Sequence, residues 1–299
     1  MDMMLCLTEV LVRHNTELLK ARVEVHKRLL QEGWRIAMRS RHYLTTECLD
    51  PPNASAWVSL YSSASDTNFL NATSLTRQAH VVSHFDLGLV FCFYVGSMEN
   101  STLHMLFGLP PATLVRTLRK AEKALEGFAP ARISFPSPAQ QVRLEKLVEA
   151  REPLLKHIFG FIDGKHVMQP SNPDLQNAMY NGWLHSVFVT GTICFAADGC
   201  IIWCKHNCPG SWNDSDTSLG FRMKLLDPAV CPDPRMNAAE WDMEIMQKVY
   251  SRLNLPLLSD PAVRGLRLNN IFRLVNYRVR TVGISQIRLT FSGAMELSV

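Results

Sequence analysis

The sequence predicts a mixed α/β protein of the α+β kind, in which a helical N-terminal portion precedes a core containing a small sheet. Three observations predict this class. Apolar residues recur at helical spacing through the first 135 residues, strand patterns begin near residue 158, and helical patterns return toward the C-terminus. Because 47% of the 299 residues are hydrophobic, the chain has enough apolar side chains for a complete core.

The helical portion is expected to cover residues 1–135. Leucines and valines at helical spacing predict a helix over 1–45, and a polar stretch broken by Pro51 and Pro52 follows. Residues 75–97 return to an apolar period and predict a buried helix pair.

Residues 101–127 are expected to form a helix-turn-helix. Two helical patterns flank a Gly-Leu-Pro-Pro turn at Gly108, and the second helix of such a motif can enter the DNA major groove. Helix pairs of this kind also occur in helical domains that never meet DNA. The basic residues of the second helix favour DNA contact; they are Arg116, Arg119, Lys120 and Lys123.

Strand patterns follow a helix predicted over residues 138–157. HIFGFIDGKHV predicts a short buried strand that ends in Asp163 and a glycine. The apolar runs on either side of Asp198 and Gly199 predict a β-hairpin, which leads through a loop into a helix. Residues 237–258 predict a further helix.

Composition and the N-terminal sequence predict a soluble intracellular protein. Asp2 and Glu9 interrupt the segment in which a secretion signal needs an apolar stretch. The longest apolar run, from Leu87 to Val95, is shorter than the roughly 20 residues that cross a bilayer. No association with a membrane is therefore expected, and the eight cysteines are expected to be reduced thiols.

An arginine-rich block without acidic residues lies between residues 261 and 295. Such a block suits contact with a phosphate backbone, and it suits a solvated basic helix equally well. The arginines are Arg264, Arg267, Arg273, Arg278, Arg280 and Arg288.

Asp163 and Asp214 are the candidate metal ligands. A carboxylate at the end of a buried strand needs a cation, hydrogen bonds or an exposed position, which applies to Asp163. Asp214 lies beyond the predicted hairpin, so strand pairing can bring the two aspartates together. Grouped carboxylates bind Mg²⁺ or Mn²⁺. Taken singly, each aspartate also suits a loop cap, since Asp-Gly and Asn-Asp-Ser are good turn sequences.

The blocks GFIDGKHV, YNGWLHSVFV, DGCIIWCKHNCPGSWNDS and AAEWDMEIMQKVYSRLNLPL resemble the DDE superfamily endonucleases of the PIF/Harbinger transposase group in its fungal form. The resemblance covers roughly residues 55–290. It implies an RNase H-like nuclease domain over residues 155–290, in which Asp163, Asp214 and a helix-borne Glu240 hold Mg²⁺ or Mn²⁺ and catalyse DNA strand cleavage and transfer. It also implies DNA as substrate, a separate Myb-like DNA-binding partner protein and a location in the nucleus.

One segment departs from this group. Relatives carry a longer stretch before the last acidic residue, with a further strand and an aspartate in a motif resembling S/G-D-x-A/G-F-P. Here the domain is truncated between residues 226 and 238, so one core strand and one ligand are expected to be missing. Asp227 and Asp233 both precede proline in this stretch and are interpreted as turn residues. The deletion reflects either a decaying or repurposed transposon gene or a gene model that lacks an exon.

Two functions are compatible with these observations. The first is a transposase-derived, metal-dependent DNA endonuclease, weakened because fewer carboxylates bind a cation less tightly. The second is a catalytically inert DNA-binding or protein-interaction remnant that uses the helical portion and the arginine-rich tail. Whether the chain is an enzyme depends on which of the two holds.

Overall fold

The computed structural model divides the chain into two compact units, Met1–Leu49 and Asp50–Val299. In the first unit, residues 14, 16–25 and 28 are helical, as predicted for residues 1–45, and the rest of that prediction lies outside the described residues. The residues that the structure describes are 14, 16–25, 28, 49–75, 84–96, 98–168, 179–183, 185–240, 249–254, 258, 260–283 and 285–292.

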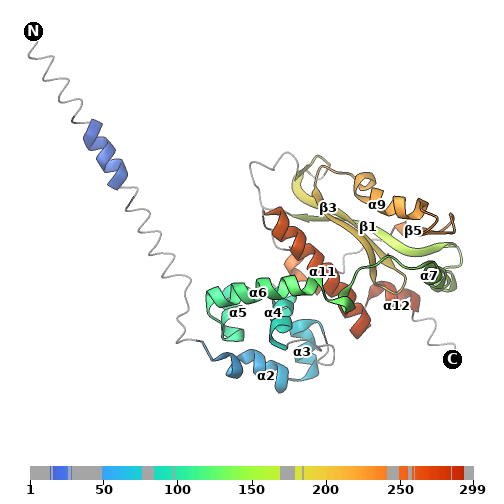
Figure 1. Ribbon diagram of the computed structural model, residues 1–299, viewed down its shortest axis with the longest axis horizontal. Coiled ribbons are helices and arrows are strands. Elements are labelled where there is room, and N and C mark those ends of the chain that lie inside the picture. Colours follow the sequence, from blue (N-terminus) through green and yellow to red (C-terminus); the bar gives the residue numbers. More distant parts are fainter. Residues whose placement is uncertain are drawn as a thin grey trace, which may run out of the picture. The chain divides into compact units, whose positions relative to one another are not determined.

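The second unit begins with a group of helices (Figure 1), and aromatic side chains pack between them. After the 3-10 turn η2 (Pro52–Ala54), these are α2 (Ala56–Ser62), α3 (Asp66–Thr73), α4 (His84–Val95), α5 (Asn100–Phe107) and α6 (Pro111–Glu126). The 3-10 turn η4 (Ala129–Ala131) follows α6 in the sequence. Trp57 is almost fully buried and stacks on Phe107 with the ring centroids 5.0 Å apart. The aromatic cluster explains why these short helices hold together, since helices of this length are marginal alone.

The helix pair predicted over residues 101–127 is confirmed as α5 and α6. Gly108 ends α5 with φ of 63°, a left-handed conformation that glycine adopts readily. Of the pair predicted over residues 75–97, the described part forms one helix, α4, and residues 76–83 and 97 lie outside the described residues.

A mixed five-stranded sheet confirms the predicted α+β class. The strands are β1 (Ile158–Met168), β2 (Tyr180–Asn181), β3 (Ser186–Ala196), β4 (Ile201–Pro209) and β5 (Asn237–Glu240). β1, β3 and β4 pair antiparallel, β2 pairs with the start of β3, and β5 runs parallel to β1 on its other edge. The predicted hairpin is confirmed, with Gly199 at φ of 86° in the turn between β3 and β4.

Two strand predictions need correction. β1 continues past Asp163 to Met168 because β3 pairs with it along this whole length, so Asp163 lies within the strand and not at its end. The helix predicted over residues 237–258 is wrong at its start, where β5 pairs with the open edge of β1 from Ile158 to Ile162. Residues 241–248 lie outside the described residues.

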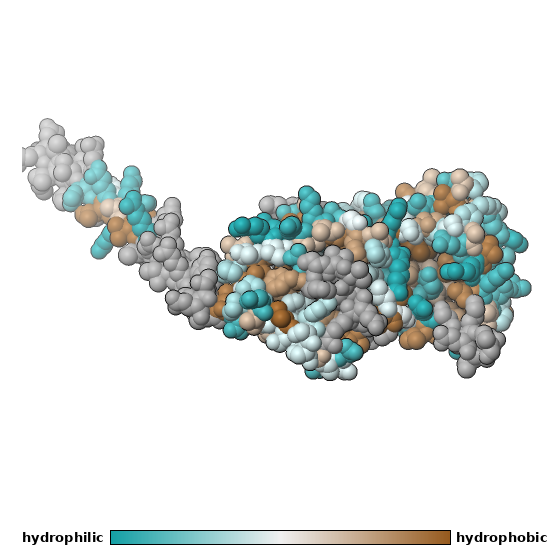
Figure 2. Space-filling view, turned by 60° about the horizontal axis from the view of Figure 1, so that its bottom comes forward, coloured by the Kyte–Doolittle hydropathy of each residue, from teal (hydrophilic) through white to brown (hydrophobic). Residues whose placement is uncertain are grey.

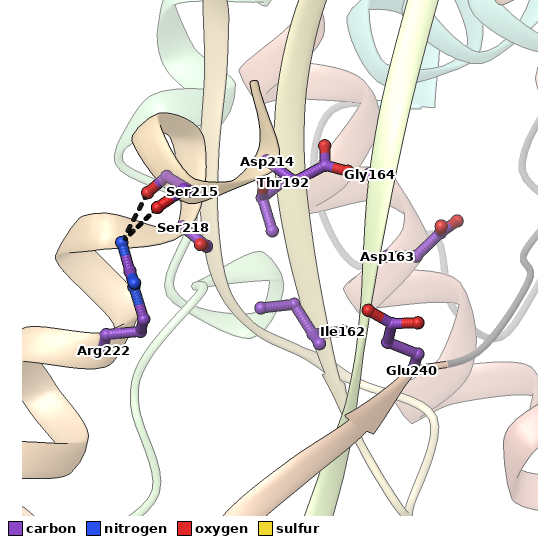
Figure 3. A pocket seen from close by; sticks show the side chains of 9 residues that line it. All are labelled: Ile162, Asp163, Gly164, Thr192, Asp214, Ser215, Ser218, Arg222 and Glu240. Carbon is purple, nitrogen blue, oxygen red and sulfur yellow. Dashed lines mark hydrogen bonds between the residues drawn. The ribbon is translucent and has the colours of Figure 1, made fainter. Parts of the chain in front are cut away.

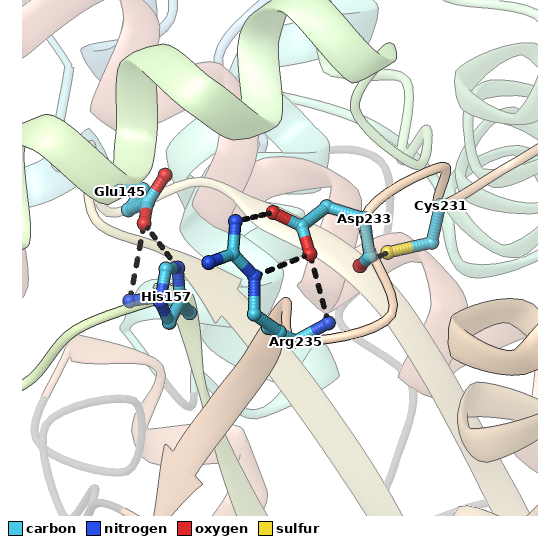
Figure 4. Close-up of polar contacts among 5 residues, drawn as sticks. All are labelled: Glu145, His157, Cys231, Asp233 and Arg235. Atoms are coloured by element: carbon cyan, nitrogen blue, oxygen red, sulfur yellow. Dashed lines mark hydrogen bonds and ion pairs between the residues drawn. The ribbon is translucent and has the colours of Figure 1, made fainter.

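The loop before β5 contains two aspartate turns, as predicted, and Figure 4 shows the one at Asp233. Asp227 accepts a hydrogen bond from the backbone N–H of Ala229 at 2.9 Å, and Asp233 accepts one from the backbone N–H of Arg235 at 3.0 Å. The Arg235 guanidinium also donates to both Asp233 oxygens, and these bonds lower the pKa of Asp233 to about 2. Both aspartates serve the loop, which confirms their interpretation as turn residues.

Helices cover both faces of the sheet. Along β4, Trp203 contacts Phe221 of α9 (Asp214–Leu226), whereas His206 contacts Phe272 of α11 (Pro261–Val282). Because side chains alternate along a strand, residues three positions apart point to opposite faces. Phe161 of β1 stacks on Phe291 of the short helix α12 (Gln286–Ser292). The remaining elements are α7 (Pro138–Arg151), which contacts β1, and η5 (Ser251–Asn254).

The arginine-rich helix α11 is an internal helix. Arg264 is buried, with Nε donating to Asn207 Oδ1 at 2.6 Å, and the Arg267 Nε donates to the buried Glu122 at 3.1 Å. Both interpretations of the arginine block assumed exposed side chains, so they are wrong for these two residues. No helix in the described part of the chain is long and apolar enough to cross a membrane. On the face shown in Figure 2, hydrophobic residues lie scattered among hydrophilic ones, as is ordinary for a protein surface.

His206 predicts a pH dependence of folding. Burial between β4 and α11 lowers its pKa to about 4, and the positive charge of Lys205 adds to this effect. The unfolded chain therefore binds more protons than the folded one between pH 6.5 and 4, so stability is lost as the pH falls through this window. We expect wild type to lose on the order of 2 kcal/mol more than His206→Gln across this range, measured by urea unfolding. Parallel pH profiles for the two proteins would contradict the assignment.

Candidate functional site

The three predicted carboxylates line one pocket of about 490 Å³. They come from separate elements: Asp163 from β1, Asp214 from the first residue of α9, and Glu240 from the last residue of β5 (Figure 3). The remaining lining residues are Ile162, Gly164, Thr192, Ser215, Ser218 and Arg222. The fold thus brings together side chains that the sequence analysis selected from distant motifs.

Asp214 is positioned by the first turn of α9. The cap of this helix is formed by Asn213, whose side chain accepts a hydrogen bond from the backbone N–H of Asp216 at 2.9 Å, while the Asp216 carboxylate accepts from the Asn213 N–H. A buried hydrogen bond of 2.6 Å between the hydroxyls of Thr192 and Thr217 joins this turn to β3. Asp214 itself is therefore not the capping residue of this helix.

Gly164 leaves the space that the Asp214 carboxylate occupies beside β1. A Cβ atom at position 164 would lie 2.9 Å from Asp214 Oδ1, which is closer than side chains normally approach. The lack of a side chain at Gly164 lets the carboxylate lie directly against β1. This contact explains in physical terms why an aspartate and a glycine so far apart in the sequence belong to one site.

Glu240 lies on a strand, whereas the sequence analysis expected it on a helix. It pairs with Ile162 in the parallel register of β1 and β5. Paired neighbours point to the same face of a sheet, so Glu240 shares the face of Ile162 and Gly164, on which Asp214 also lies. Two of the three carboxylates therefore occupy the α9 face of the sheet.

Asp163 belongs to the opposite face of β1. It alternates with Ile162 and Gly164 along the strand, and Figure 3 shows the Asp163 and Asp214 carboxylates on either side of β1. β5 ends at Glu240, beside Ile162, so its pairing does not extend along β1 to Asp163. The pocket reaches around this part of the strand, and for that reason side chains from both faces line it.

The donor atoms suit a hard cation, but the carboxylates are spread out. Carboxylate oxygens are the ligands that Mg²⁺ and Mn²⁺ prefer. Within the described residues, however, no group of three or more His, Cys, Asp or Glu side chains is close enough to hold a metal ion. The residues that follow Glu240 directly, 241–248, lie outside this description. The proposed metal ligands thus share a pocket without forming one compact cluster, and the metal stays a prediction.

Arg222 is a pocket residue that the sequence analysis missed. Its Nη2 donates to the backbone oxygen of Ser215 at 2.7 Å and to the Ser215 hydroxyl at 2.9 Å, which holds the guanidinium beside the acidic side chains (Figure 3). Ser218 and Arg222 follow Asp214 at steps of four residues. This helical spacing from Asp214 was the signal in the sequence that could have identified them.

A side chain at position 164 tests the placement of Asp214. We expect Gly164→Ala to displace the Asp214 carboxylate and to weaken Mn²⁺ binding about tenfold, measured by electron paramagnetic resonance of free Mn²⁺, since removing a charged ligand lowers cation affinity. Stability should change by less than about 1 kcal/mol because the displaced atom is the end of a flexible side chain. Gly182→Ala is the matched control, because nothing lies within 4 Å of its added Cβ. Equal Mn²⁺ affinity of the two variants would argue against the geometry.

Comparison of the chain with protein-family models, with curated proteins and with solved structures returned no match. The assignment of a function therefore depends on the sequence motifs together with the geometry of this pocket.

Proposed function

We propose that this chain is a transposase-derived, metal-dependent DNA endonuclease of the PIF/Harbinger type. The observation that carries the proposal is the single pocket that Asp163, Asp214 and Glu240 all line, because these are the acidic residues to which the family motifs point. The reaction is hydrolysis or transfer of DNA phosphodiester bonds. A nuclear location and a Myb-like partner protein belong to the same proposal and derive from the resemblance alone.

The order of the strands supports an RNase H-like core. Three antiparallel strands, β1, β3 and β4, are followed by a helix, α9, and then by a strand parallel to β1. This succession is compatible with the nuclease domain proposed for residues 155–290. In this proposal Glu240, at the end of the short β5, supplies the third acid of the site.

The charged side chains of the pocket suit two roles in this proposal: its carboxylates would bind a cation, and its arginine would bind a DNA phosphate. The carboxylates that line the pocket repel a DNA phosphate unless a cation neutralises their charge. When bound, a divalent cation supplies this neutralisation and lowers the pKa of the attacking water. Asp214 and Glu240 would offer oxygen ligands on one face of β1, and Asp163 would offer them on the other. Arg222, held by Ser215, offers a guanidinium to a phosphate oxygen at the α9 side of the pocket.

A second candidate function is a catalytically inert DNA-binding remnant. Arg116, Arg119, Lys120 and Lys123 are all exposed on α6, the second helix of the proposed helix-turn-helix. The spread of the three carboxylates also favours this alternative, since a looser site binds a cation less tightly. The two functions differ in whether the protein cuts the DNA that it binds.

Nicking of supercoiled plasmid in the presence of Mn²⁺ separates the two functions. We expect wild type to nick and Asp163→Asn to lose at least about 100-fold of this activity, the scale seen when a group that stabilises the transition state is removed. Glu149→Gln, an exposed carboxylate on α7 outside the pocket, is the matched control and should nick like wild type.

DNA binding without plasmid nicking would overturn the nuclease proposal. If wild type does not nick but binds DNA with strong salt dependence, the remnant is the better account. Arg119→Ala combined with Lys123→Ala should then reduce the salt dependence, because each phosphate contact contributes about 0.9 to the slope of log affinity against log salt.

A further inference from the structure

A second pocket adjoins the acidic pocket and shares Asp214 with it. Its volume is about 510 Å³, within the range of pockets that hold small organic groups. Two tryptophans line it, Trp183 from the turn after β2 and Trp212 from the turn before α9. Asn181, Ser211 and Asn213 add amide and hydroxyl groups to the same lining.

The exposure of these tryptophans is unusual for structural residues. Trp183 is 90% exposed and Trp212 is 40% exposed, whereas Trp57 in the helical core is 1% exposed. A tryptophan contributes to folding mainly by burying its large ring, and Trp183 buries almost none of it. An exposed aromatic face beside a pocket is more typical of ligand contact.

Hydrogen bonds connect the two tryptophan-bearing turns. The Asn181 Oδ1 accepts from the backbone N–H of Trp183 at 3.0 Å, and the Asn181 Nδ2 donates to the carbonyl of Gly210 at 2.9 Å. Gly210 itself packs against backbone, since a Cβ there would lie 2.3 Å from the Met179 carbonyl oxygen. The backbone of Trp212 is fixed as well, by a hydrogen bond of 3.0 Å from its N–H to the Pro209 carbonyl. The two rings are therefore carried by turns that are tied to each other.

We propose that the pocket of Trp183 and Trp212 takes an unstacked base of the DNA strand whose phosphate lies at the acidic pocket. Every nucleobase has a flat face that stacks on an aromatic ring and edges that bond to amides and hydroxyls, which matches this lining. A base and the phosphate attached to it are neighbours, as are the two pockets on either side of Asp214. This inference rests on the proposed function in taking DNA as the ligand.

Binding of a fluorescein-labelled single-stranded oligonucleotide, measured in Ca²⁺ so that a hard cation can neutralise the carboxylates, tests the inference without a plasmid-nicking assay. Trp183→Ala and Trp212→Ala should each weaken binding about 5- to 150-fold, the loss expected for one stacked base. Trp183→Phe should retain most of the affinity because it keeps an aromatic face. Leu154→Ala, a substitution at a 95% exposed residue outside the pocket, is the control and should bind like wild type.

An oligonucleotide of the same length that lacks all bases completes the test. Wild type and the tryptophan variants should bind this backbone equally, because stacking is absent for each of them. The inference is overturned if wild type does not bind the normal strand, if the variants bind it like wild type, or if they lose equally on the baseless strand. If the protein does not nick plasmid but meets these binding expectations, the nuclease proposal is wrong and the base pocket is supported. If the protein nicks plasmid but fails the binding expectations, only the base pocket is wrong.

Discussion

Glu122 is a carboxylate buried on α6, and it lies between the phenol of Tyr94 and the guanidinium of Arg267. Tyr94 donates to Glu122 Oε1 at 2.8 Å and Arg267 Nε donates to the same oxygen at 3.1 Å. An unpaired charge buried this deeply would cost several kcal/mol, so the folded state requires both partners. Burial, followed by the charge of Glu122, raises the pKa of Tyr94, which keeps the phenol protonated as the donor.

This requirement fixes α11 against the helical portion, and α11 in turn holds the sheet. Asn276, fully buried on α11, accepts from the backbone N–H of Ile201 at 2.6 Å and donates to its carbonyl at 2.8 Å. Ile201 begins β4, so these bonds secure the hairpin from which Trp203 reaches α9. The geometry of the acidic pocket therefore depends on a chain of contacts that starts at Glu122 and passes through a helix whose arginines suggested a surface role.

The sequence predicted those elements whose signals are local. The hairpin follows from alternating strands around Asp198 and Gly199, and the loop and helix at Asp214 follow from turn and capping residues. β5 was missed because alanine and glutamate favour a helix locally, and the strand arises only through pairing with β1. The burial of Arg264 was missed for a related reason: its partner Asn207 is far away in the sequence, and no local pattern identifies it.

The acidic residues of the pocket were identified from their motifs, but their arrangement was not. Alternation along a strand fixes the face of each residue only once the strand is known to continue, and β1 continues past Asp163. The contact of Asp214 with Gly164 likewise required the fold. The most direct test of the account is an anomalous difference map from crystals of the chain grown with Mn²⁺. The account predicts a peak in the pocket, within coordination distance of Asp214 or Glu240. A map with no peak there, or with Mn²⁺ bound only elsewhere, would contradict it.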